Sequence, residues 1–274
     1  MAPSTPPAPL ATKTIYPAGP AKERSIRRTP VALLHGFTQN QGVLEPFGRL
    51  LAELAGRPVV LVDLPGHGGS SGIVLDLPGC ADLLARRLAG SALVGYSLGG
   101  RITLTLAQRH PNAMAALAVI GANPGLADPV DRAERLDADR RLAGRLAAVE
   151  GSEQLRSFLV SWLGNPLFGG IPPEVAGVEA RLANRPGPMA EMLMATSLGG
   201  QDNLWDAAAQ IGVPALYLYG ERDEKFSSLA KRYCAGSNGR VRCAAVPGAA
   251  HYAIGEAPYA TARVLAAFLD QAGI

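Results

Sequence analysis

Short apolar runs recur along the chain, each closed by turn-forming residues. The runs occupy residues 31–34, 58–64, 91–96, 116–121, 213–219 and 241–246. They are too short for helices, and their continuous apolar character is typical of strands that are buried on both faces of a parallel sheet. Helical stretches are expected between most of them, at about residues 43–55, 78–89, 98–110, 226–235 and 258–272. This alternation predicts an α/β fold with a doubly wound, mostly parallel sheet.

One long segment interrupts the alternation. Residues 123–208 show helical and loop patterns without a convincing strand, which predicts a helical cap inserted into the core. The α/β core is then split into residues 15–122 and 209–274, and 274 residues suit one such domain. Residues 1–14 are rich in proline and small side chains and are expected to form a flexible tail. The region before residue 30 gives little sign of strands, so we expect a short sheet at that edge.

Charge and cysteine content narrow the possible classes. The 26 basic and 23 acidic residues are scattered rather than gathered into a basic stripe, so nucleic acid is not expected as a partner. No apolar run reaches membrane-spanning length, and the first residues lack the pattern of a signal peptide. Cys80, Cys234 and Cys243 have no metal-ligand spacing and are expected to be buried, reduced thiols. We therefore expect a cytoplasmic protein, monomeric or a small homo-oligomer, with no membrane partner, metal or cofactor.

The strongest candidate for chemistry is Ser97, at the centre of the pentapeptide Gly95-Tyr96-Ser97-Leu98-Gly99. An apolar run precedes this G-x-S-x-G motif and a helical stretch follows it, which is the context that gives the motif meaning. The glycines permit a sharp turn, and the hydroxyl then stands at the carboxyl end of the sheet beside a positive helix N-terminus. The alternative is an ordinary strand-to-helix turn that happens to contain serine. The motif predicts a reactive serine if a histidine and an acid are placed to activate it.

His251 is the expected partner of Ser97. The order that accompanies this motif is serine, acid, histidine, and only His110 and His251 follow Ser97. His110 ends the helical stretch that Ser97 begins, which puts it more than about 10 Å away by helix rise. His251 instead lies in the loop after the last apolar run. We therefore expect His251 to act on the serine hydroxyl and His110 to be a solvated residue.

The acid is expected in the loop that follows the apolar run 213–219. That loop carries Glu221, Asp223 and Glu224. Its G-x-x-D arrangement favours Asp223, and the two glutamates are expected to be solvated loop charges. Asp223 would hold the tautomer of His251 and stabilise the imidazolium that forms when the histidine takes a proton.

Two backbone amides are expected to form an oxyanion site. One belongs to Leu98, directly after the serine, and the other to Phe37, in the loop after the first long apolar run. His35 in the same loop has two possible roles: it anchors the loop through hydrogen bonds to backbone, or it contacts a substrate. His67, in the stretch DLPGHGGSSG, is expected to order the turn that follows it.

Several stretches together resemble the α/β-hydrolase superfamily along the whole core. They are LLHGF, DLPGHGGS, GYSLGG, YGERDEKF and PGAAH. The stretches VGYSLGGR, NPGLADPVDRAERLDADRRLA, SWLGNPLF, MATSLGGQDNLW and YGERDEKFSSLA are further similar to the 2-succinyl-6-hydroxy-2,4-cyclohexadiene-1-carboxylate synthase family of menaquinone biosynthesis. This resemblance implies elimination of pyruvate from an enolpyruvyl precursor, with Ser97, Asp223 and His251 acting as a proton-abstracting base system. The alternative is a cap-bearing serine hydrolase acting on an ester, lactone or carbon–carbon bond, because many esterases share the core motifs.

The resemblance also implies which residues bind a substrate that carries several carboxylates. Arg101, one helical turn after Ser97, would pair with a carboxylate through its planar guanidinium, although an ordinary helix-surface arginine has the same pattern. Arg135 and Arg181 fall close to the substrate-binding arginines of the family, with Arg132 as the second choice for the first position. The sequence therefore predicts a small-molecule polycarboxylate as the ligand.

Two aromatic side chains are further candidates for the pocket wall. Tyr96 flanks the serine, and Trp162 lies in an amphipathic stretch of the cap, where packing is an equally good explanation. The sequence departs from the family in the histidine loop. That loop usually reads G-H-N, whereas here it reads Ala250-His251-Tyr252.

Overall fold

The structure, a computed structural model, describes residues 10–274. Its strands are β1 (Thr12–Ile15), β2 (Val31–Leu34), β3 (Val59–Val62), β4 (Ala92–Tyr96), β5 (Ala116–Ile120), β6 (Ala215–Gly220) and β7 (Val241–Val246). Its helices are α1 (Ala21–Ser25), α2 (Gln41–Ala55), α3 (Leu77–Arg87), α4 (Leu98–Arg109), α5 (Pro129–Ala147), α6 (Gly151–Leu163), α7 (Pro173–Ala176), α8 (Val178–Arg181), α9 (Pro186–Ala195), α10 (Glu224–Ala235), α11 (Ala253–Glu256) and α12 (Pro258–Gln271). Short 3₁₀ helices cover Gly68–Ser70, Pro166–Phe168 and Asp206–Gln210.

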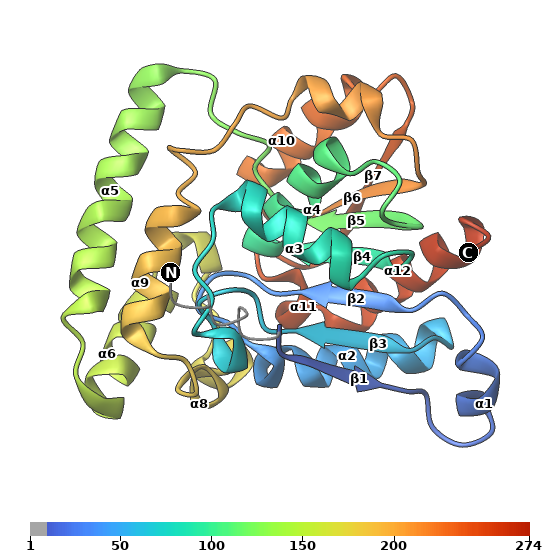
Figure 1. Cartoon of the computed structure of the whole chain (residues 1–274), viewed down its shortest axis with the longest axis horizontal. Coiled ribbons are helices and arrows are strands. Elements are labelled where there is room, and N and C mark those ends of the chain that lie inside the picture. The colour runs from blue at the N-terminus through green and yellow to red at the C-terminus, as the bar shows by residue number, and fades with distance from the viewer. Residues whose placement is uncertain (1–9) are drawn as a thin grey trace, which may run out of the picture.

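The described strands form one sheet in the order β1-β3-β2-β4-β5-β6-β7. Strands β2 to β7 run parallel, and β1 pairs antiparallel with β3. Helices α2 and α12 pack on one face of the sheet, and α3, α4 and α10 pack on the other (Figure 1). This arrangement confirms the predicted doubly wound, mostly parallel sheet. Because the strands are parallel, the loops after β2, β4, β6 and β7 meet at one edge.

The apolar runs were recognisable because the central strands are covered on both faces. Every residue of β2, from Val31 to Leu34, and of β5, from Ala116 to Ile120, is buried. Complete burial of one such Val, Leu or Ile side chain contributes about 1.5–3 kcal/mol relative to exposure. These strands therefore form the rigid framework from which the loops of the site project.

At the N-terminus the structure corrects two expectations. Residues 12–14 were expected to belong to the flexible tail, but they form β1 together with Ile15. The sheet is therefore not short at this edge, as the sequence had suggested. The strand escaped prediction because three of its four residues are exposed, so an edge strand of this composition lacks an apolar run. Residues 1–9 of the expected tail lie outside the described residues.

The segment between β5 and β6 forms helices α5 to α9 and, within the described residues, contains no strand. Figure 1 shows α5, α6, α8 and α9 beyond the carboxyl ends of the strands. These helices share an apolar cluster of their own, which includes Leu146, Leu159 and Met189. The inserted segment therefore packs as a cap over the edge of the sheet where the site loops meet.

The three cysteines differ in exposure. Cys80 is buried in the core, Cys234 is partly buried and Cys243 is exposed. The prediction that all three are buried is therefore wrong for Cys243. This residue lies in β7, the strand at one edge of the sheet, whose four central residues are exposed or only partly buried.

Candidate active site

Ser97 occupies the sharp turn between β4 and α4. Its φ of 51° and ψ of −106° lie in a region that residues with a side chain rarely adopt. The backbone N–H of Ser97 donates to the carbonyl of Ile120 in the neighbouring strand at 2.9 Å, which helps to hold this conformation. Strained backbone that the surrounding structure holds in place occurs often at functional sites.

The glycines around Ser97 are required by close backbone packing. A Cβ on Gly95 would lie 2.4 Å from the carbonyl oxygen of Gly99, and a Cβ on Gly99 would lie 2.4 Å from the carbonyl oxygen of Leu34. Such distances are far below van der Waals contact. Strand β4, helix α4 and the end of β2 therefore approach one another only because both positions are glycine.

His251 and Asp223 are brought together from the loops after β7 and β6. The Nδ1 of His251 donates to Oδ2 of Asp223 at 3.0 Å, and both side chains are buried. The other carboxylate oxygen of Asp223 accepts from the backbone N–H of Phe226 at 3.0 Å, so Asp223 also caps α10. This bond fixes the proton on Nδ1 and leaves Nε2 of His251 as the basic nitrogen. Both residues are those expected from the sequence.

Ring packing further restricts the imidazole of His251. The ring of Phe226 lies 4.4 Å from it, centroid to centroid, and the ring of Tyr96 lies 5.5 Å from it. Gly121 has φ of +57°, and a Cβ there would lie 2.9 Å from Cε1 of His251. Gly121 thus provides the space in which the histidine lies against the end of β5.

The amides of Phe37 and Leu98 are available for a ligand. Among the described residues, neither backbone N–H donates to another protein group. Both residues line the same cavity as Ser97. The arrangement can therefore supply two hydrogen-bond donors to an oxygen that gains negative charge beside the serine.

His35 and His67 hold the loop that carries Phe37. Nε2 of His35 accepts from the N–H of Leu64 at 3.0 Å, and its Nδ1 donates to the carbonyl of Gly36 at 2.8 Å. His67 in turn accepts from the N–H of Thr38 at 3.3 Å. His35 is fully buried and does not line the cavity, so its observed contacts are those of a loop anchor rather than of a substrate contact.

Burial keeps both of these histidines neutral. It lowers the pKa of His67 to about 4. Burial, and then the proximity of His67, hold the pKa of His35 well below its ordinary value. A neutral imidazole has one donor and one acceptor nitrogen. Each ring uses both, since Nδ1 of His67 also donates to the carbonyl of Pro65 at 2.9 Å.

A single cavity between the core and the cap collects most of the candidate residues. It is lined by Phe37, Tyr96, Ser97, Leu98, Arg101, Arg135, Trp162, Arg181 and His251. Lys225 also lines it, and none of its described lining residues is acidic. The cavity is therefore strongly cationic and suits an anionic ligand.

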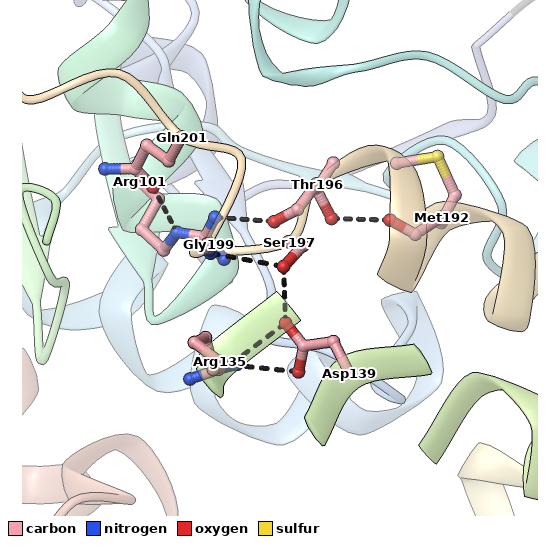
Figure 2. Close-up of polar contacts among 8 residues, drawn as sticks. All are labelled: Arg101, Arg135, Asp139, Met192, Thr196, Ser197, Gly199 and Gln201. Carbon is pink, nitrogen blue, oxygen red and sulfur yellow. Dashed lines mark hydrogen bonds and ion pairs between the residues drawn. The ribbon is translucent and has the colours of Figure 1, made fainter. Parts of the chain in front are cut away.

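Arg101 and Arg135 are each held by the protein through Nε (Figure 2). Nε of Arg101 donates to Oε1 of Gln201 at 2.5 Å, and one terminal nitrogen donates to the carbonyl of Thr196 at 2.5 Å. Burial, and secondarily the charge of Arg135, lower the pKa of Arg101 to about 9, which leaves it charged at neutral pH. Arg101 is thus not an ordinary surface arginine, because the segment after α9 fixes it against the cavity.

Arg181 joins the cap to the loop after β2. It is buried; its Nε donates to the carbonyl of Ala176 at 2.8 Å, and one terminal nitrogen donates to Oγ1 of Thr38. Thr38 has φ of 67°, a left-handed conformation that is unusual for a β-branched residue. Nδ2 of Asn184 supports the same residue by donating to the Thr38 carbonyl at 2.7 Å. Two cap side chains therefore stabilise the loop that presents the Phe37 amide.

Several lining residues were not anticipated from the sequence. They are Gly36, Gln39, Gly121, Asn123, Leu167, Phe168, Leu193, Thr196, Leu198, Lys225 and Phe226. Gln39 lies two residues after LLHGF, and Lys225 lies within YGERDEKF. Proximity to a motif was the one available signal, and it does not reveal which side chain turns inward.

No group of three His, Cys, Asp or Glu side chains suited to a metal ion occurs within residues 10–274. No helix in that range has the length and apolarity needed to cross a bilayer.

Comparison with known proteins agrees with this architecture. The family model described as the alpha/beta hydrolase family matches residues 31–264. The chain belongs to the α/β-hydrolase family. The matched range runs from β2 into α12 and includes the inserted cap, so membership of this family covers both parts of the site.

Individual relatives agree with the narrower resemblance. A 2-succinyl-6-hydroxy-2,4-cyclohexadiene-1-carboxylate synthase of Enterobacter sp. (strain 638) is 34% identical over 247 residues, which cover 87% of this chain and 91% of the relative. The structure of MenH from S. aureus has 26% sequence identity and a TM-score of 0.82, covering 96% of this chain and 99% of the other. A malate-bound thermophilic esterase from Thermogutta terrifontis, at 21% identity and a TM-score of 0.75 with coverage of 97% and 94%, shares the fold. These relatives place the chain among the enzymes of the α/β-hydrolase fold.

Proposed function

We propose that the protein is a 2-succinyl-6-hydroxy-2,4-cyclohexadiene-1-carboxylate synthase, a carbon–oxygen lyase that eliminates pyruvate from an enolpyruvyl precursor. The observation that carries the proposal is the composition of the cavity. Ser97 and His251 share it with four cationic side chains, those of Arg101, Arg135, Arg181 and Lys225, and with no acidic one among the described lining residues. A polycarboxylate substrate fits such a cavity better than a neutral ester does.

In the proposed reaction His251 activates Ser97 as a base. The serine oxygen takes a proton from a carbon of the substrate while its own proton passes to Nε2 of His251, and Asp223 stabilises the resulting imidazolium. The electrons of the broken C–H bond form a new double bond, and the C–O bond to the enolpyruvyl group breaks. The departing enolate takes a proton as the imidazolium of His251 gives one up, which yields pyruvate and restores the neutral histidine and the serine hydroxyl.

The oxyanion amides have a defined task in this scheme. Deprotonation next to a carbonyl moves negative charge onto the carbonyl oxygen. The N–H groups of Phe37 and Leu98 would stabilise that oxygen. The arginines would bind the carboxylates that do not react, which aligns the C–H bond with Ser97.

Incubation of the purified protein with the enolpyruvyl precursor tests the proposal. Pyruvate release is monitored through a coupled reaction that reduces the pyruvate. We expect turnover of this precursor and little hydrolysis of p-nitrophenyl esters or lactones. Rapid ester hydrolysis without pyruvate release would instead assign the protein to the serine hydrolases of the family.

A further inference from the structure

The side-chain amide of Gln39 is buried, and within residues 10–274 only its oxygen has a hydrogen-bond partner of good geometry. Its Oε1 accepts from the backbone N–H of Gly36 at 2.8 Å, which fixes the orientation of the amide. Its Nε2 is buried and meets no hydrogen-bond geometry with a described residue, although the Gln39 amide lies close enough to the Tyr252 hydroxyl to oppose the rise in its pKa that burial causes. The whole side chain is 1% exposed, yet it lines the cavity that contains Ser97. An unpaired buried donor destabilises the folded protein, so a bound ligand that accepts from Nε2 would relieve this cost.

A second unpaired donor lies beside it. The hydroxyl of Tyr96 is buried and also lacks a partner among the described residues. The two side chains meet over Gly36, since a Cβ on that glycine would lie 2.8 Å from Cε1 of Tyr96 and 3.3 Å from Oε1 of Gln39. The absence of a side chain at Gly36 thus leaves room for both side chains, which line the same cavity.

The charge around these two donors is positive. Arg181 is buried and forms no ion pair with a described carboxylate. Its charge acts on the Tyr96 and Tyr252 hydroxyls, which face the same region from β4 and from the start of α11. A buried cation without an acidic partner is stable only beside an anion or a well-placed set of dipoles.

We propose that Gln39 is a substrate-binding and specificity-determining residue whose Nε2 donates to a carboxylate oxygen of the ligand, together with Tyr96 and next to Arg181. The proposal rests on the proposed function for the nature of the ligand. A fixed amide donor requires an acceptor, so together with the charge of Arg181 this part of the cavity favours a carboxylate over an ammonium group. Gln39 also supports the Gly36 amide, so one side chain links ligand binding to the geometry of the loop that carries Phe37.

The two functions of Gln39 are separable by substitution. Gln39→Glu keeps an oxygen that accepts from the Gly36 amide but replaces the Nε2 donor with a second, negatively charged oxygen. Gln39→Met keeps the length of the side chain and removes both the donor and the acceptor. Gln41→Glu introduces the same charge two residues away, at a half-buried position that does not line the cavity, and serves as the matched control.

The experiment measures the KM for the enolpyruvyl precursor and the affinity for 2-succinyl-6-hydroxy-2,4-cyclohexadiene-1-carboxylate by titration calorimetry. For Gln39→Glu we expect KM and Kd to rise at least about 30-fold with a much smaller change in kcat, because a carboxylate then faces a carboxylate. For Gln39→Met we expect Kd to rise about 10-fold, and for Gln41→Glu we expect no more than a twofold change.

The outcomes separate the possible explanations. If Gln39 only supports the loop, Gln39→Glu will bind like the wild type and only Gln39→Met will lose activity, which overturns the proposal. If Gln39→Glu does not fold, an unchanged Kd for Gln39→Met overturns it equally. Failure of the wild-type protein to release pyruvate and to bind the product would instead count against the proposed function.

Discussion

Nε of Arg135 donates to both carboxylate oxygens of Asp139, each at 2.9 Å, one helical turn further along α5. The same carboxylate accepts from Oγ of Ser197 at 2.7 Å, so the segment after α9 is tied to α5 at this point (Figure 2). Among the described residues, none accepts a hydrogen bond from the terminal nitrogens of Arg135, which lines the cavity. Asp139 therefore fixes the guanidinium of Arg135 through Nε and leaves its terminal nitrogens available to a ligand.

Removal of this anchor is expected to weaken substrate binding. In Asp139→Ala, Arg135 loses the carboxylate that orients it, and Ser197 loses its acceptor. A buried hydrogen bond to a charged group is worth about 1.5–3 kcal/mol, so kcat/KM should fall roughly 10- to 150-fold, mainly through KM. Steady-state kinetics of pyruvate release measure this effect. Asp137→Ala is the control, because Asp137 is exposed and pairs with Arg140 on the outside of the same helix.

The role of Arg101 distinguishes the two possible reactions. Arg101→Ala should lower kcat/KM about 10- to 150-fold for the polycarboxylate precursor, because a partly desolvated charge-assisted contact is lost. Lysine should restore only part of the loss, since it keeps the charge without the planar fork. Arg109→Ala should have no effect, because Arg109 is an exposed residue of α4 and pairs with Asp82 of α3. An equal loss of activity toward a small neutral ester would mean that Arg101 supports the serine turn structurally.

Prediction from sequence succeeded where one local requirement determines a residue. The central strands had to be apolar because both their faces are covered, and Gly95 and Gly99 had to be glycine because backbone atoms occupy the space of a Cβ. The chain order of Ser97, Asp223 and His251 follows from parallel strands whose ends meet at one edge. The hydrogen bond between Asp223 and His251 was therefore foreseeable without a structure.

Prediction failed where the relevant partner is distant in sequence. The cavity role of Gln39 depends on the orientation that the Gly36 amide gives it, and β1 depends on pairing with β3 rather than on its own composition. The anchors of Arg101 come from a segment about a hundred residues later, Thr196 to Gln201. Periodicity and motif spacing predict local secondary structure and which faces are buried. Neither predicts where a polar side chain points at the interface between the core and the cap.

Acid should destabilise the protein through His67. Its pKa is about 4 in the folded protein against an ordinary value of 6.5, so the unfolded chain binds more protons between these two pH values. The free energy of unfolding should fall as the pH drops below 6.5, with a contribution from His67 of about 3 kcal/mol by pH 4. The lowered pKa of His35 acts in the same direction. Urea unfolding at a series of pH values should give a shallower pH dependence for His67→Gln than for the wild type. Identical slopes would show that His67 is not held neutral.

The pair of Ser97 and His251 is expected to carry the chemical step. Ser97→Ala and His251→Ala should each reduce kcat by about 10³-fold or more, with circular dichroism and thermal unfolding showing an intact fold. His110→Ala is the matched histidine control, because His110 lies at the far end of α4 and contacts Asp82. Turnover near that of the wild type in folded Ser97→Ala would remove the serine from the mechanism.

The elimination and hydrolysis mechanisms differ in whether Ser97 becomes covalently modified. If the serine and His251 only transfer a proton, no bond forms between Ser97 and carbon, and the protein stays unmodified throughout turnover. Rapid quenching in acid at times from milliseconds to seconds, followed by intact-mass measurement, should then give the unmodified mass at every time point. A serine hydrolase supplied with an activated ester should instead show an acyl adduct that appears in a burst and decays. We expect no adduct with the enolpyruvyl precursor in either the wild type or Ser97→Ala. Detection of such an adduct on Ser97 would rule out the proton-transfer scheme.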